Sequence, residues 1–134
     1  MKTLIVTMCL TGLSALALAQ NAPATPPRIT TADAKSHNGK TVTVCGKVVD
    51  TKVPRYGLAG RGKPVTFDLD QPEPKPVFFF VAFGSQDGGP QEAVAAYKDK
   101  RVCVTGKIEM TAEPLVPFIL AADRSQIKPQ ADDK

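Results

Sequence analysis

The sequence predicts an all-β fold, a five-stranded Greek-key β-barrel with a short helix between strands 3 and 4. Its clearest sign is a strand pattern that occurs twice: residues 41–48 read TVTVCGKV and residues 101–108 read RVCVTGKI. Three further short runs are rich in valine and phenylalanine, and turns rich in glycine and proline separate them. Strand repeats this far apart in the sequence favour a small domain held by long-range strand pairing.

In the two repeated strands a cysteine and a threonine exchange places. If the strands pair antiparallel with residue numbers that sum to 148, Cys45 lies opposite Cys103. The same register sets Thr43 opposite Thr105. We therefore expect a disulfide between the two cysteines, with two unpaired buried thiols as the alternative. Both cysteines fall on the outward phase of their strands, which predicts a disulfide at the surface.

The predicted register also sets Lys47 opposite Arg101. Like charges directly across a ladder destabilise it, so we expect either a bulge at this end or an acidic group nearby. Gly46 and Gly106 lie inside the two strands, where a small barrel has to bend sharply.

Residues 1–19 predict a cleaved signal peptide and a periplasmic or secreted protein. Lys2 gives a short basic start, residues 4–18 are mostly apolar, and Ala17 and Ala19 are small residues at the expected cleavage site. The apolar stretch is too short and too polar to predict a membrane span. Cleavage would remove Cys9, whose lipidation is the alternative, and would leave the even cysteine count that is typical of exported disulfide proteins.

The rest of the chain divides into three parts. Residues 20–30 are rich in proline and alanine and predict an extended linker, residues 31–128 predict the barrel, and residues 129–134 predict a polar tail. Within the barrel we expect a helix over 91–97 and strands over 41–49, 65–69, 77–83, 101–110 and 115–121.

Alternation of side chains assigns an inner and an outer face to these strands. In the second strand Phe67 points inward and Asp68 points outward into water. In the third strand Phe78 and Phe80 point inward. The outer face of the third strand then carries Phe79, Val81 and Phe83.

Five strands with a short helix between the third and fourth is the order of an oligonucleotide/oligosaccharide-binding (OB) barrel. The segments HNGKTVTVCGKV, RGKPVTFDLDQPEPKPVFFFVAFG, YKDKRVCVTGKI and DRSQI resemble a family of small exported bacterial OB-like proteins that are often described as nucleic-acid-binding. The resemblance covers about residues 34–127. It implies the fold and a nucleic-acid ligand, and it carries no shared catalytic motif. Phe79 stands where the relatives often have a polar residue.

The candidate ligand site combines the loop between the first two strands with the outer face of the second and third. OB domains bind single strands there, with basic groups along the phosphates and aromatic rings under the bases. The alternative is a solvated loop, because Asp68, Asp70 and Glu73 lie close in the sequence and would repel phosphates. The candidate ligand-binding residues are Lys52, Arg55, Tyr56, Arg61, Lys63, Phe79 and Phe83.

Two other functions stay open. The apolar outer face of the third strand would also suit an envelope protein or a small molecule as partner. A secreted OB-scaffold nuclease, similar to the micrococcal type, would need a metal held by Asp68 and Asp70 with Arg55 and Arg61 on the phosphate. No general base with the expected spacing accompanies them.

The amino-acid composition also bears on which classes of function are possible. The chain has 17 basic and 13 acidic residues, a bias too weak to indicate nucleic-acid binding by itself. Its one histidine, His37, precedes the first strand and is expected to hydrogen-bond in a turn. Haem and zinc sites need more ligands than this chain offers. We expect no catalytic residues, no metal, no cofactor and no enzyme activity, and the sequence leaves the oligomeric state open.

Overall fold

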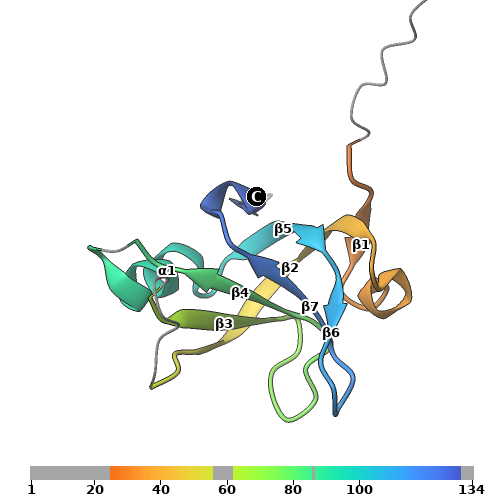
Figure 1. The fold of residues 1–134 in the computed structure, drawn as a ribbon, viewed down its shortest axis with the longest axis horizontal. Helices are drawn as coiled ribbons and strands as arrows, with labels where there is room; N and C mark the ends of the chain where they lie inside the picture. The colour runs from red at the N-terminus through yellow and green to blue at the C-terminus, as the bar shows by residue number, and fades with distance from the viewer. Residues whose placement is uncertain (1–24, 56–61, 86, 131–134) are drawn as a thin grey trace, which may run out of the picture.

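The computed structural model describes residues 25–55, 62–85 and 87–130. This part of the chain is mostly β-sheet, with one α-helix and two short 3-10 helices (Figure 1). The elements in chain order are β1 (Arg28–Thr30), η1 (Ala34–His37), β2 (Thr41–Lys52), β3 (Pro64–Leu69), β4 (Phe79–Phe83), α1 (Gly89–Tyr97), β5 (Arg101–Lys107), β6 (Glu109–Met110), β7 (Pro117–Ala121), η2 (Arg124–Gln126) and β8 (Ile127–Pro129).

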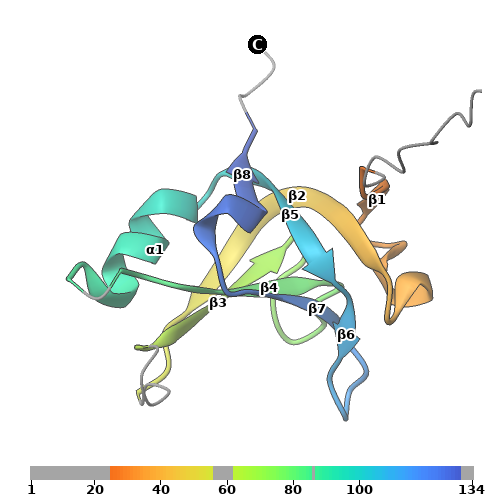
Figure 2. The same cartoon turned by 45° about the horizontal axis from the view of Figure 1, so that its top comes forward.

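The eight strands form one sheet in the order β6-β7-β4-β3-β2-β5-β8, with β1 beside β2. The long strand β2 organises this sheet. Its first part pairs antiparallel with β5 and its last part pairs antiparallel with β3. Figure 2 shows β2 arching over the molecule between these two partners. Strands β4 and β7, far apart in the sequence, pair in parallel.

The prediction of a closed five-stranded barrel is wrong. Strand β5 ends at Lys107, and Ile108 separates it from β6. Only the two residues of β6 pair with β7, and no ladder joins β5 to β7 within the described residues. A barrel needs every strand paired along both edges. The fold is therefore all-β, as predicted, but its sheet is open.

Two short strands were not predicted, one at the end of the expected linker and one across the boundary between the expected barrel and tail. Arg28–Thr30 form β1, which adds in parallel to the edge of β2. Ile127–Pro129 form β8, which pairs antiparallel with β5. Strands of three residues are too short to give a recognisable alternation of apolar and polar side chains.

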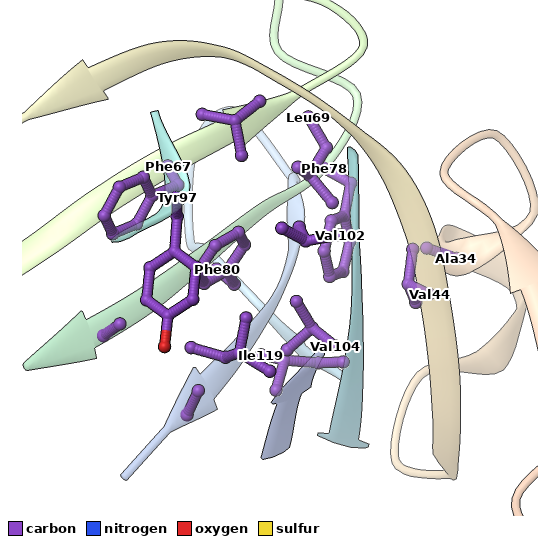
Figure 3. Close-up of a cluster of buried hydrophobic side chains, with 14 of the residues drawn as sticks. Ala34, Val44, Phe67, Leu69, Phe78, Phe80, Tyr97, Val102, Val104 and Ile119 are labelled. Atoms are coloured by element: carbon purple, nitrogen blue, oxygen red, sulfur yellow. The ribbon is translucent and has the colours of Figure 1, made fainter. Parts of the chain in front are cut away.

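Most core side chains come from β2, β3, β4, β5, β7 and α1 (Figure 3). The rings of Phe67 and Phe80 stack at a centroid distance of 4.8 Å, and the ring of Tyr97 meets Phe67 edge-on at 5.6 Å. Tyr97 comes from α1, which lies between β4 and β5 as predicted. The fully buried large side chains are Phe67, Phe78, Phe80, Leu69, Ile108, Ile119, Val42, Val44, Val48, Val65, Val102 and Val104.

The predicted register of the repeated strands is confirmed. Cys45 pairs with Cys103 and forms the disulfide. The hydroxyl groups of Thr43 and Thr105 share a hydrogen bond of 2.7 Å. The expectation of a surface disulfide is wrong for Cys103, which is only 6% exposed. Its sulfur lies 3.5 Å from the Arg28 guanidinium, because β1 and β8 flank the ladder that the sequence placed in solvent.

Lys47 and Arg101 face each other in the ladder, as the register requires. The only register shift of β2 lies further on, between Val48 and Asp50, and it concerns the pairing with β3. An acidic group does lie beside Lys47: Asp70 Oδ1 accepts a hydrogen bond of 2.9 Å from the backbone N–H of Lys47. That carboxylate also explains Gly46, because a Cβ there would meet it at 2.9 Å.

No helix of the described residues is long and apolar enough to cross a membrane. A disulfide is typical of exported proteins, so it fits the expected localisation. The predicted signal peptide and Cys9 lie outside the described residues.

We expect the disulfide to supply a large part of the folding stability. It joins residues 58 apart in the sequence, so its loss should lower the free energy of unfolding by about 4 kcal/mol at most. Denaturant melts of the oxidised chain with and without reductant measure this. The Cys45→Ser/Cys103→Ser variant is the control and should not respond to reductant. An unchanged melt of the wild-type chain under reductant would contradict the stabilising role.

Candidate ligand-binding groove

A groove of about 420 Å³ lies on the outer face of β3 and β4. The end of β2, the 70–78 connection and the 111–116 connection enclose it. The lining residues that matter for its chemistry are Lys52, Thr66, Asp68, Glu73, Phe79 and Val116.

The floor of the groove follows from the strand register. Asp68 of β3 pairs with Phe79 of β4, and Phe79 pairs with Phe118 of β7, so these side chains share the outer face. The rings of Phe79 and Phe118 stack almost parallel, with centroids 5.1 Å apart. The sequence analysis missed Phe118, because the parallel β4–β7 pairing joins segments nearly forty residues apart and has no local signal.

Asp68 is buried, with only 2% of its surface exposed, although the sequence predicted a hydrated position. Its outward phase is as expected, but the groove walls cover it. Its Oδ2 has no hydrogen-bond partner, and the ammonium of Lys52 lies 3.3 Å from that oxygen as an ion pair. Burial raises the pKa of Asp68, with Lys52 acting against it and the charges of Asp50 and Glu73 adding to it.

Lys52 lies between two carboxylates. Its ammonium donates a hydrogen bond of 2.6 Å to Glu73 Oε1 and forms the ion pair with Asp68. Partial burial acts to lower the pKa of Lys52, but the hydrogen bond to Glu73 and the charge of Asp68 raise it. The amine is therefore charged at neutral pH and already engaged, so it is not free to meet a phosphate.

The structure separates the predicted site residues. Lys52 and Phe79 both line the groove. Phe83 shares the outer face but pairs with Pro64, four residues further along β4, which places it about 14 Å from Phe79. Val81 lies between the two rings on this face, so they do not form one stacking platform.

The basic candidates belong to the other end of the same face. Arg55 and Lys63 are exposed and border the loop between β2 and β3. Tyr56 and Arg61 lie outside the described residues. Around the groove itself the carboxylates of Asp68, Glu73 and Glu113 outnumber the single amine of Lys52.

Asp70 does not join Asp68 in the groove. Its carboxylate accepts hydrogen bonds from the Thr31 hydroxyl at 2.7 Å and from the backbone N–H of Lys47. No group of three or more histidine, cysteine, aspartate or glutamate side chains within the described residues is placed to hold a metal ion. The Nδ1 of His37 lies 2.9 Å from the carbonyl oxygen of Asp33, in the turn contact that the sequence predicted.

No family model matches this chain, and no curated protein matches its sequence. The functional inference therefore depends on the geometry and charge of the groove.

We expect Asp68→Asn to stabilise the fold at neutral pH. The pKa of Asp68 is higher in the folded protein than in the unfolded chain, where an aspartate has a pKa of about 3.9. Such a carboxyl group favours folding most at pH values below the pKa of the unfolded chain. This contribution is lost as the pH rises through the folded pKa. The gain from Asp68→Asn should therefore be present at neutral pH and shrink in acid, as denaturant melts at several pH values would show.

Lys52→Met should destabilise the fold at neutral pH by about 1 kcal/mol, since it leaves a buried carboxylate without its cation, and the half-exposed lysine limits the effect. Adding Asp68→Asn should restore the loss. The exposed Asp87→Asn is the control and should be neutral. A double variant no more stable than Lys52→Met alone would contradict the coupling.

Proposed function

We propose that this chain is a binding module that holds a polypeptide segment of another exported protein in the groove. The segment would carry a lysine or arginine next to an apolar side chain. The observation that supports this most directly is Asp68 Oδ2, a buried oxygen without a hydrogen-bond donor beside the ring of Phe79. The ion pair with Lys52 leaves this buried oxygen without a hydrogen bond, which is costly, and a charged donor from a ligand would supply one.

Lys52 supports the same chemistry. Its ammonium occupies the space between Asp68 and Glu73, so a primary amine fits there. The side chain is 42% exposed, which leaves it free to turn into solvent when a ligand cation takes its place. In the free protein Lys52 would thus act as a substitute for the ligand.

The apolar part of the ligand would contact the aromatic floor. Phe79 and Phe118 are half-buried and form a rigid stacked pair. Leu115 and Leu120, on either side of Phe118 in the sequence, are exposed large apolar residues. An aromatic floor with a few directed polar groups is typical of specific binding sites. The groove supplies both an aromatic floor and directed polar groups. The role we propose for it is binding without catalysis.

We also propose that the fold is an open variant of the OB barrel. Three features support it: the β2-β3-β4 meander, the helix before β5, and the parallel pairing of β4 with β7. OB domains bind ligands on the outer face of the strands that correspond to β3 and β4, where the groove lies.

The peptide proposal predicts a preference for a cation beside an apolar side chain. N-acetyl-Lys-Phe-amide should shift the ring NMR signals of Phe79 and Phe118 at lower concentration than N-acetyl-Gln-Phe-amide. Asp68→Asn should weaken binding of the lysine peptide about tenfold, since it removes a charge-assisted hydrogen bond. Asp87→Asn carries the same chemical change outside the groove and should leave binding unchanged. Equal shifts with both peptides would contradict the proposal.

Single-stranded nucleic acid is the second candidate, favoured by the exposed Arg55 and Lys63 at the Phe83 end of the same face. If it binds there, anisotropy of labelled single-stranded DNA and RNA should report affinity that falls steeply with salt, because binding releases counterions. Lys63→Glu should weaken this binding and Lys75→Glu should not. Flat traces at low salt would exclude this ligand for the face.

A further inference from the structure

A second surface, away from the groove, carries an unbroken positive charge. Strands β1, β2, β5 and β8 lie side by side along one side of the molecule (Figure 2). Their register places five basic side chains on the outer face around the Cys45–Cys103 disulfide. The basic face consists of Arg28, Lys47, Arg101, Lys107 and Lys128, all exposed.

No carboxylate lies on the outward positions of the β1, β2, β5 and β8 ladders around the disulfide in the described residues, and the outward Asp50 of β2 lies beyond the register shift, opposite Asp68. Two acids next to these strands, Asp33 and Asp70, have other contacts. Asp33 accepts a hydrogen bond from Thr30, and Asp70 accepts hydrogen bonds from Thr31 and from the backbone of Lys47. None of the five basic side chains forms an ion pair with another described residue.

The basic face is unfavourable for the isolated domain. Lys47 lies directly opposite Arg101 in the ladder, and such like-charge pairs destabilise a sheet. A bulge would relieve the repulsion, but the ladder here is regular. The Asp70 carboxylate lies beside Lys47, where it already accepts hydrogen bonds from the Thr31 hydroxyl and from the Lys47 backbone N–H. An external anion would neutralise both charges. The arrangement therefore indicates binding of a negatively charged partner.

The side chains of the face favour phospholipid headgroups over a nucleic acid. The centre of the face consists of the disulfide and the hydrogen-bonded hydroxyl groups of Thr43 and Thr105, without a projecting ring. Single-stranded nucleic acids need aromatic side chains on which their bases stack, and the outward positions of these described strands hold none. Phosphate headgroups of a bilayer need only a flat array of cations.

The course of the chain points to the same partner. The chain enters the basic face at β1, since Arg28 is both the first residue of that strand and a member of the face. The apolar residues 4–18, which we expect to direct export, precede it in the sequence. Residues 20–27 span at most about 28 Å when fully extended. Until the expected signal peptide is cleaved, the chain would thus keep this face within reach of the headgroups of the membrane that exports it.

We propose that the basic face docks the protein on a membrane surface rich in anionic phospholipids. The exposed cations lie over the headgroup phosphates, and the groove on β3 and β4 takes no part. The proposal is therefore independent of the peptide ligand. Each cation close to such a surface strengthens binding about fivefold.

Vesicle co-sedimentation tests the proposal directly. The oxidised chain from Gln20 onward, which contains every described residue, is mixed with phosphatidylcholine vesicles with or without phosphatidylglycerol. It should sediment with the anionic vesicles at low salt and stay in solution with the neutral ones. Lys47→Gln/Arg101→Gln should weaken binding about thirtyfold. The matched control, Lys35→Gln/Lys75→Gln, removes two charges outside the face and should weaken it clearly less.

The outcomes separate the possible partners. Lys47→Gln/Arg101→Gln should melt no lower than the wild-type chain, because it removes a repulsive pair. Lys128→Gln, on the edge strand β8, gives a second measure of vesicle binding with little risk to folding. Equal binding to neutral vesicles, equal losses in both double variants, or failure to sediment at low salt would overturn the proposal. Binding of labelled single-stranded DNA through Lys47 and Arg101 without vesicle binding would overturn it in favour of nucleic acid.

Discussion

The antiparallel ladder between β2 and β5 is the constraint on which the rest of the structure depends. The disulfide fixes its register at Cys45 and Cys103, and a shift by one residue would turn every core valine of both strands toward solvent. The same link outweighs the repulsion two residues away, where Lys47 faces Arg101. A disulfide closing a loop of this length stabilises by up to about 4 kcal/mol, whereas a cross-strand pair changes stability by about 1 kcal/mol or less.

Much of this frame could be predicted from the sequence, because it rests on local patterns. The exchange of cysteine and threonine gave the register, and alternation gave the buried positions of Phe67, Phe78 and Phe80. The open sheet could not be predicted, since closure depends on whether β5 continues past Ile108 to meet β7. The burial of Cys103 could not be predicted either, because it depends on β1 and β8, which have only three residues each.

The candidate groove was predictable only in part, for a related reason. Alternation placed Asp68 and Phe79 on the outer face, and Lys52 was a candidate residue. What makes the site distinctive comes from contacts between segments that are distant in the sequence. The 70–78 and 111–116 connections cover Asp68, and β7 brings Phe118 beside Phe79. Charge counts along the sequence could not show that Lys52 is engaged by two carboxylates.

The modest net charge of the chain, +4, conceals two surfaces of opposite character. The outer face of β3 and β4 combines aromatic rings with an excess of carboxylates. Around the disulfide, the outward charged side chains of the ladders that join β1, β2, β5 and β8 are all cations in the described residues. The two faces lie along different parts of β2, because the groove lies where β2 pairs with β3 and the basic face lies where β2 pairs with β5. At physiological salt, charges further apart than about 8 Å are largely screened from each other. The two proposed binding roles are therefore compatible in one fold, in which the disulfide ladder supports the basic face.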